Sequence, residues 1–210
     1  MARARARYAP SVQPREASDD VLTRRDELLE IAAELFATQG YVGTSTRDIG
    51  NRANILSGSL FHHFDSKDQM VDELIRPYFD QMLVRTRKAV NQATPPDVAL
   101  RELICSLIEL MGEGPLRARI LHNDWQYLEQ SFPYLSKGMA ELERLWLKLL
   151  RRGVSQGVLR DDVDLRIAYL AVIGGMSELT RWYQPDGSKS IDEIADVFVK
   201  LYVSGLKARR

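Results

Sequence analysis

Residues 44–67, TSTRDIGNRANILSGSLFHHFDSK, decide the fold because they pattern as two short helices joined by a tight turn. Ser45 is followed three positions later by Asp48, which fits a capping box at the start of a helix. Apolar residues then recur at helical spacing, and this predicts a first helix over Thr46 to Ala53. Asn54 tolerates the left-handed backbone conformation that ends a helix, so we expect the turn to begin there.

The second half of this stretch predicts another short helix, over Gly58 to Phe64, with Ser57 as its cap. Leu60 and Phe64 are spaced to face inward, while small or hydrogen-bonding residues remain around the outside. Lys67 then opens the following helix. Two short helices with a tight turn and an exposed second helix are typical of a helix-turn-helix, which places its second helix in the major groove of DNA.

These two helices resemble the DNA-binding motif of the tetracycline-repressor (TetR) family of bacterial transcriptional regulators. The resemblance is carried by TSTRDIGNRANI followed by SGSLFHHFDSK. The family pattern is Thr-Arg-Asp-Ile-Ala, then small-Gly-Ser/Thr-Leu-Tyr-His/Tyr-His-Phe, then Ser-Lys. The match covers Arg25 to Leu74. It departs from the family at Asn54, where glycine is usual, and at Phe61, where tyrosine is usual.

The resemblance implies a role in DNA contact for a set of residues in this stretch. In the family, the start of the first helix approaches phosphate and a base edge, the second helix enters the major groove, and the following lysine pairs with phosphate. Arginine is the usual bidentate reader of guanine. Phe61 in place of tyrosine removes one hydroxyl donor, which predicts altered strength rather than lost function. The expected DNA-binding residues are Thr46, Arg47, Ser57, Gly58, Ser59, Phe61, His62, His63 and Lys67.

Charge gives the chain no general affinity for nucleic acid. Its 210 residues include 29 Lys or Arg and 29 Asp or Glu, so the formal net charge is zero and DNA binding must come from placed contacts. Residues 1–22 differ, because their first part carries arginines without acids; we expect a disordered basic arm. We expect residues 23–68 to form the helix-turn-helix domain and residues 69–210 to form an effector-binding and dimerisation domain.

Several classes of protein are disfavoured by what the sequence lacks. Cys105 is the only cysteine, so neither an internal disulfide nor a cysteine-based zinc site can form, and we expect a cytoplasmic protein. No apolar run approaches the length of a membrane span. His62 and His63 are adjacent and point about 100° apart on a helix, which argues against a shared metal ion. No catalytic motif occurs, and we expect no enzyme activity, no cofactor and no metal.

The remainder of the chain predicts further helices and no sheet. We expect an all-α protein of about nine helices, since no stretch alternates with the period of a strand. A helix capped by Thr23 and stopped by Gly40 precedes the helix-turn-helix. The later helices are expected over Lys67–Gln92, Asp97–Met111, Leu116–Ser131, Pro133–Gln156, Leu165–Tyr183 and Ile191–Lys207.

Large and adaptable side chains in the second part suggest where a small-molecule effector would bind. In the resembling family an effector binds within the larger helical domain and changes the spacing of the two DNA-reading heads. Gly174 and Gly175 in mid-helix indicate either close approach at a dimer interface, which we favour, or a ligand lying on the backbone. The candidate lining residues are Tyr78, Met82, Leu103, Leu107, Met111, Trp125, Trp146, Tyr169, Met176 and Trp182, with ordinary core packing as the alternative for each.

Together these features predict a ligand-responsive bacterial regulator that binds a palindromic operator as a homodimer, with repression as the family default. Two heads about 34 Å apart can read half-sites one helical turn apart. RWYQPDG, residues 181–187, and ILSGSLFHHF resemble a branch that responds to acyl-coenzyme A thioesters, including steroid- and fatty-acid-catabolism repressors. The alternatives are a DNA-binding regulator without a small-molecule effector and a helical enzyme or carrier with a vestigial head.

Overall fold

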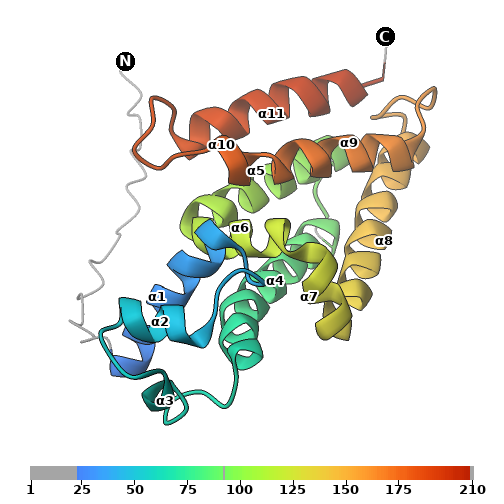
Figure 1. Ribbon diagram of the computed structural model, residues 1–210. Helices are drawn as coiled ribbons and strands as arrows, with labels where there is room; N and C mark the ends of the chain where they lie inside the picture. Colours follow the sequence, from blue (N-terminus) through green and yellow to red (C-terminus); the bar gives the residue numbers. More distant parts are fainter. Residues whose placement is uncertain (1–22, 92, 209–210) are drawn as a thin grey trace, which may run out of the picture.

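The computed structural model describes residues 23–91 and 93–208, which form eleven α-helices and no strand (Figure 1). This confirms the all-α expectation. The basic arm expected over residues 1–22 lies outside the described residues. None of the helices in the described part is long and apolar enough to cross a membrane. The helices are α1 (Arg24–Gln39), α2 (Thr46–Arg52), α3 (Ser57–Leu60), α4 (Lys67–Asn91), α5 (Pro96–Glu113), α6 (Pro115–Asn123), α7 (Trp125–Ser131), α8 (Pro133–Ser155), α9 (Leu165–Ser177), α10 (Leu179–Trp182) and α11 (Ile191–Leu206).

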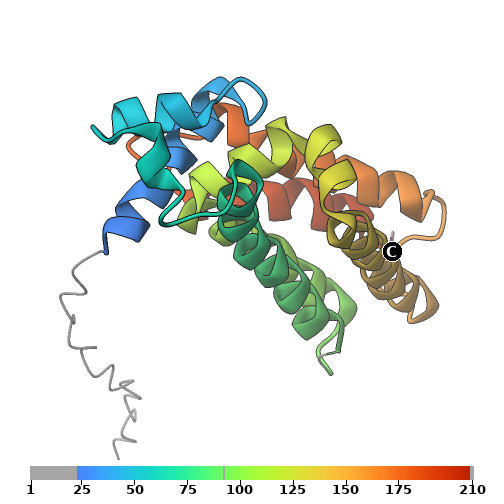
Figure 2. The same cartoon turned by 60° about the horizontal axis from the view of Figure 1, so that its bottom comes forward.

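Helices α1, α2 and α3 form a head at one end of the molecule (Figure 2). Thr23 and Asp26 make the predicted capping box, in which the Asp26 amide donates to Thr23 Oγ1 at 3.3 Å and the Thr23 amide donates to Asp26 Oδ2 at 3.0 Å. Gly40 ends α1 with a φ of 81°, a conformation that favours glycine. Phe36 and Leu60 are buried between the three helices and form part of the small core of the head.

The remaining helices form a body, and two of them join it to the head. Helix α4 leaves the head directly after the helix-turn-helix and packs in the body beside α5 and α8. Helix α6 packs against α1, so the body also touches the head through side-chain contacts. Helix α5 is central, as predicted, because it packs against α4, α8 and α11 with Leu103 and Ile104 fully buried. A change in the body therefore has two routes to the head.

Most predicted helices agree with the structure to within two residues at each end, and three differ by more. The helix expected over Leu116–Ser131 is divided into α6 and α7 at Asp124, whose side chain bonds the head, and the helix expected over Leu165–Tyr183 is divided into α9 and α10 at Glu178. Helix α3 is shorter than the expected Gly58–Phe64, because the chain turns after Leu60. One-residue corners leave the apolar period almost unchanged, so periodicity alone does not reveal them.

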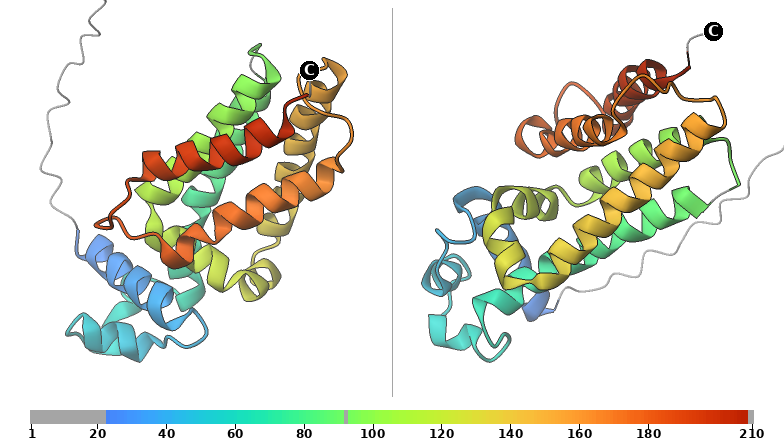
Figure 3. Two further views of the ribbon diagram at one scale, coloured as in Figure 1. Left: turned by 90° about the horizontal axis from the view of Figure 1, so that it is seen from above. Right: turned by 90° about the vertical axis from the view of Figure 1, so that its right-hand side faces the viewer.

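Helices α9 and α11 lie side by side on the outer face of the body (Figures 1 and 3). Gly175 permits their close approach, since a Cβ atom there would lie 2.6 Å from the Tyr202 hydroxyl oxygen. Tyr202 in turn donates its hydroxyl proton to the Ala171 carbonyl at 3.0 Å. A Cβ on Gly174 would meet nothing within 4 Å, so this glycine faces outward. Large apolar side chains are exposed on the same two helices: Ile167, Leu170, Val197 and Leu201.

Candidate functional site

Helices α2 and α3 of the head are joined as the sequence predicts. Ser45 and Asp48 form a capping box at the start of α2, with the Ser45 amide donating to Asp48 Oδ2 at 2.8 Å. Asn54 takes the left-handed conformation, with a φ of 55°, in the turn between α2 and α3. The added Cβ of an alanine at Gly50 would lie 3.0 Å from the Ile55 carbonyl oxygen, so glycine lets the turn pack closely on α2. The helix-turn-helix geometry is therefore held by local interactions.

Helix α3 begins with a residue that no local interaction requires. Leu56 occupies its N-cap position, makes no side-chain cap bond and is 81% exposed. A serine, threonine or aspartate at an N-cap is worth about 1 kcal/mol relative to an apolar residue. The position of Leu56 beside Ile55 predicts apolar contact across the turn, but the exposed side chain shows that this prediction is wrong. The structure also places the cap of this helix at Leu56, one residue before Ser57, which the sequence predicted as the cap.

The predicted DNA-contact residues lie in and around α2 and α3. Arg47 is exposed in the first turn of α2, and among residues 23–67 it is the only cation without a hydrogen-bond or ion-pair partner. Thr46, Ser57 and Ser59 are half-buried, and Gly58 is exposed. A Cβ on Gly58 would meet nothing within 4 Å, so packing does not explain the glycine.

The residues that follow α3 divide between surface and interior. Phe61 is 55% exposed and His62 is exposed, whereas His63 is half-buried. The His63 carbonyl accepts a hydrogen bond from Arg25 Nε at 3.3 Å, and the same guanidinium lies over the Phe64 ring at 4.4 Å. Arg25 therefore fixes the turn that leads out of α3, a role that the sequence did not reveal.

Lys67, an expected phosphate contact, bonds carbonyl groups of the protein itself. Its Nζ donates to the Tyr41 carbonyl at 2.8 Å and to the Thr44 carbonyl at 2.7 Å, and it lies over the Tyr41 ring at 4.2 Å. Burial lowers the pKa of the Lys67 ammonium, while the carboxylates of Asp68 and Asp124 act in the opposite direction. In the structure this lysine holds the loop between α1 and α2, the loop that leads into the helix-turn-helix.

The same loop is held from the body by Asp124, at the corner between α6 and α7. The Tyr41 amide donates to Asp124 Oδ2 at 2.9 Å. The Tyr41 and Tyr127 rings pack with centroids 5.1 Å apart, which adds an α7 contact to the same loop. Burial raises the pKa of the Asp124 carboxyl, opposed by the Tyr41 amide and by Lys67. A further contact between α6 and α1 is the ion pair of Arg117 with Glu30.

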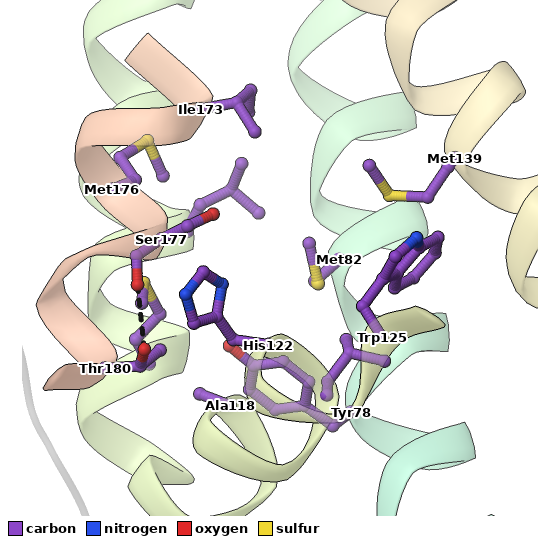
Figure 4. Close-up of a pocket in the computed structure, with 13 residues that line it drawn as sticks. Tyr78, Met82, Ala118, His122, Trp125, Met139, Ile173, Met176, Ser177 and Thr180 are labelled. Atoms are coloured by element: carbon purple, nitrogen blue, oxygen red, sulfur yellow. Dashed lines mark hydrogen bonds between the residues drawn. The ribbon is translucent and has the colours of Figure 1, made fainter. Parts of the chain in front are cut away.

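A cavity of about 280 Å³ lies in the body between helices α4 to α10 (Figure 4). Its wall is mainly apolar and includes four thioether side chains, which adapt readily to the shape of a ligand. Its polar groups come from α4, α6, α9 and α10. The lining residues are Tyr78, Met82, Leu107, Met111, Ala118, Leu121, His122, Trp125, Met139, Ile173, Met176, Ser177 and Thr180.

The predicted lining agrees with this cavity at Tyr78, Met82, Leu107, Met111, Trp125 and Met176. The structure corrects the other four positions. Leu103, Trp146 and Tyr169 are buried in the core away from the cavity wall, and Trp182 is 54% exposed. The cavity wall also contains residues that were not predicted from the sequence, because neither small and polar residues nor ordinary apolar ones give a signal that distinguishes a cavity wall from a packed helix. These are Ala118, Leu121, His122, Met139, Ile173, Ser177 and Thr180.

His122 gives the cavity a hydrogen-bonding group that no described residue occupies. Its imidazole points into the cavity, across from Ser177 and Thr180 (Figure 4). The Thr180 hydroxyl already donates to the Ser177 carbonyl at 2.8 Å. An apolar wall with a few convergent polar groups is typical of a small-molecule site. Within the described part of the chain, no three His, Cys, Asp or Glu residues are grouped so that they could hold a metal ion.

Comparison with known proteins agrees with this architecture along nearly the whole chain. Residues 28–74 match the family described as bacterial regulatory proteins, tetR family, and residues 93–206 match the tetracyclin repressor-like C-terminal domain. The chain belongs to the TetR family. It is a transcriptional regulator and not an enzyme.

Two relatives within the TetR family are similar over most of their length. The HTH-type transcriptional repressor KstR2 of Rhodococcus jostii (strain RHA1) is 36% identical over 185 residues, which cover 87% of this chain and 91% of that protein. The solved structure of the ketosteroid transcriptional regulator KstR2 of Mycobacterium tuberculosis has a TM-score of 0.84 at 32% identity and covers 90% of this chain and 97% of that chain. These relatives support a ligand-responsive transcriptional repressor.

A more distant TetR structure shares the fold. AibR, solved in complex with isovaleryl coenzyme A and operator DNA, has a TM-score of 0.73 at 22% identity and covers 86% of this chain and 98% of that chain. At this identity the likeness concerns the arrangement of the helices alone.

The position of Lys67 in this TetR regulator predicts a stability role. Lys67→Met removes two hydrogen bonds from an ammonium group to buried loop carbonyls, so we expect the free energy of unfolding in urea to fall by about 1 to 3 kcal/mol. The salt dependence of DNA binding should keep its slope, since the slope counts neutralised phosphates. Lys88→Met, at an exposed lysine of the same helix, is the matched control. Unchanged stability with a slope lower by about one would return Lys67 to the phosphate role.

Proposed function

We propose that this chain is a homodimeric repressor that binds a palindromic operator with residues 23–68 and is released by a small apolar effector bound within residues 69–210. The observation that carries the proposal is the position of the corner between α6 and α7. His122 and Trp125 line the cavity, while Asp124 between them bonds the head. A ligand that moves this corner therefore acts directly on the loop that leads into the helix-turn-helix. The protein would act on DNA in the cytoplasm.

The cavity favours a compact apolar effector with one hydrogen-bonding end. Its volume of about 280 Å³ lies just below the range of about 300 to 1,000 Å³ that is usual for drug-sized ligands. A whole coenzyme A thioester is too large for it, so the acyl group of such an effector would occupy the cavity and its nucleotide would lie outside. Since this chain is similar to the ketosteroid transcriptional regulator KstR2, we propose a ring-bearing acyl group with a ketone or hydroxyl that faces His122.

Release of DNA follows if the effector prefers a geometry of the corner in which the two heads no longer fit two half-sites. Such a ligand shifts the equilibrium only by its difference in affinity for the two geometries, and couplings of this kind are about 5- to 150-fold. Asp124 and the Arg117–Glu30 ion pair connect the corner and α6 to the head. Because closely packed helices have low compressibility, a displacement of the corner would be passed on to the head through these contacts.

Dimerisation would use the outer face formed by α9 and α11. Ile167 and Leu201 are 67% and 68% exposed there, and Gly174 leaves space for close approach of a partner helix. Exposed apolar groups on two adjacent helices are typical of a helical interface. In sedimentation experiments we expect a particle of twice the 23.9 kDa chain, and Leu201→Asp should halve it. A monomer in the unsubstituted protein would contradict the proposal.

A regulator without a small-molecule effector is the remaining alternative. Such a protein needs only a filled core in its body, because the body then serves dimerisation alone. The largely apolar cavity within the body favours an effector over that alternative.

The effector proposal is tested by fluorescence anisotropy on duplex DNA from upstream of the protein's own gene. We expect tight binding that steroid-type or long-chain acyl-coenzyme A thioesters weaken by at least about fivefold, whereas free coenzyme A leaves it unchanged. Ser177→Phe places a ring in the cavity and should abolish the response to the thioester. Ser136→Phe, at an exposed position on α8, should keep it. DNA binding that no thioester disturbs would refute this effector class and keep the DNA role.

Asp124→Ala is expected to separate effector binding from DNA release. The variant loses the acceptor for the Tyr41 amide but keeps every residue of the cavity wall. The affinity for thioester, measured by calorimetry without DNA, should stay close to that of the unsubstituted protein. The effector-dependent change in DNA affinity should fall toward onefold. Asp186→Ala, in the exposed loop before α11, is the control; full release by the effector in Asp124→Ala would show that the corner does not transmit it.

A further inference from the structure

The recognition helix carries none of the side chains that usually read purines. Residues 56–61, which comprise α3 and its two caps, read LSGSLF and contain no Arg, Lys, Asn or Gln. Arginine and lysine make the specific contacts to guanine, and asparagine and glutamine make those to adenine. Leu60 is buried, so the surface that α3 offers consists of apolar groups, two hydroxyls and a glycine. Base recognition by α3 must therefore come from apolar contact and serine hydroxyls.

Leu56 is the most prominent of these apolar groups. Its side chain is 81% exposed, the highest value among the exposed large hydrophobic residues of the described chain. It stands where a hydrogen-bonding cap residue would stabilise the helix, and it is not part of the packed core. Gly58, two residues further on, weakens the helix without relieving any contact. Positions that break local rules without internal compensation are expected where a protein meets its ligand.

Only one base presents an apolar group on its edge in the major groove, and that base is thymine with its C5 methyl. We infer that Leu56 reads thymine methyl groups in the operator, with Gly58 allowing α3 to approach the bases closely. This inference rests on the proposed DNA-binding function and specifies the chemistry of its half-site. Thymine is required opposite the start of α3. Direct recognition of guanine is left to Arg47, the exposed arginine at the start of α2.

The test replaces thymidine by deoxyuridine, which lacks only the methyl group and keeps every hydrogen-bonding edge. A duplex selected from random DNA by the protein is synthesised with thymidine and with deoxyuridine, and the two affinities are compared. Loss of one buried methyl is worth about 0.8 kcal/mol, or about fourfold in affinity. We expect the ratio of the two affinities to be at least about fourfold smaller for Leu56→Ala than for the unsubstituted protein. Single deoxyuridine substitutions then locate the thymine.

A second variant separates recognition from stability. Leu56→Ser restores a hydrogen-bonding residue at the cap, so the melting temperature should rise or stay the same while the preference for thymidine over deoxyuridine falls. A structural role for Leu56 would instead lower the melting temperature. Val84→Ala, at a 52% exposed residue of α4, is the control and should change neither quantity.

Three results would overturn the inference or its basis. An affinity ratio that Leu56→Ala leaves unchanged refutes the thymine contact while DNA binding stands. Equal affinity of the unsubstituted protein for both duplexes refutes it in the same way. Failure to select any duplex refutes the proposed DNA function, and the inference with it.

Discussion

The structure depends on one constraint, which is that the loop between α1 and α2 is held from two sides at once. Lys67 Nζ bonds two of its carbonyls from α4, and Asp124 bonds the Tyr41 amide from the corner between α6 and α7. The loop is short and leads straight into α2, so its position sets the position of the DNA-reading helices. The head is thus fixed to the body by hydrogen bonds to backbone, which have a defined geometry.

This constraint gives the cavity and the DNA surface a common part. Residues 122–125 contribute to both. His122 and Trp125 line the cavity, and Asp124 bonds the head. Because these side chains leave one short corner in different directions, no long path is needed between ligand and DNA. The exposed face of α9 and α11 lies elsewhere on the body, so a proposed dimer contact does not cover the corner (Figure 3).

Local signals in the sequence predicted local structure well. The caps at Thr23 and Ser45 and the left-handed Asn54 depend on residues a few positions apart, and each was found as predicted. The part of the site that could not be predicted depends on distant residues. Lys67 bonds the carbonyl of Tyr41, and Asp124 bonds the Tyr41 amide across 83 positions of sequence. The sequence predicts which residues of the body face inward, but it does not distinguish the cavity wall from the core. Leu103 and Leu107 lie one turn apart on α5 and are both buried, yet only Leu107 lines the cavity.

The internal use of Lys67 has a consequence for how the protein would find its operator. Among residues 23–67, Arg24, Arg25 and Arg52 pair with acids of the protein and Lys67 serves a loop, which leaves Arg47. Non-specific affinity for DNA arises almost wholly from cations free to meet phosphate. Residues 23–67 therefore supply little of the charge that holds a protein on unrelated DNA, and their contribution to binding depends mainly on the operator sequence.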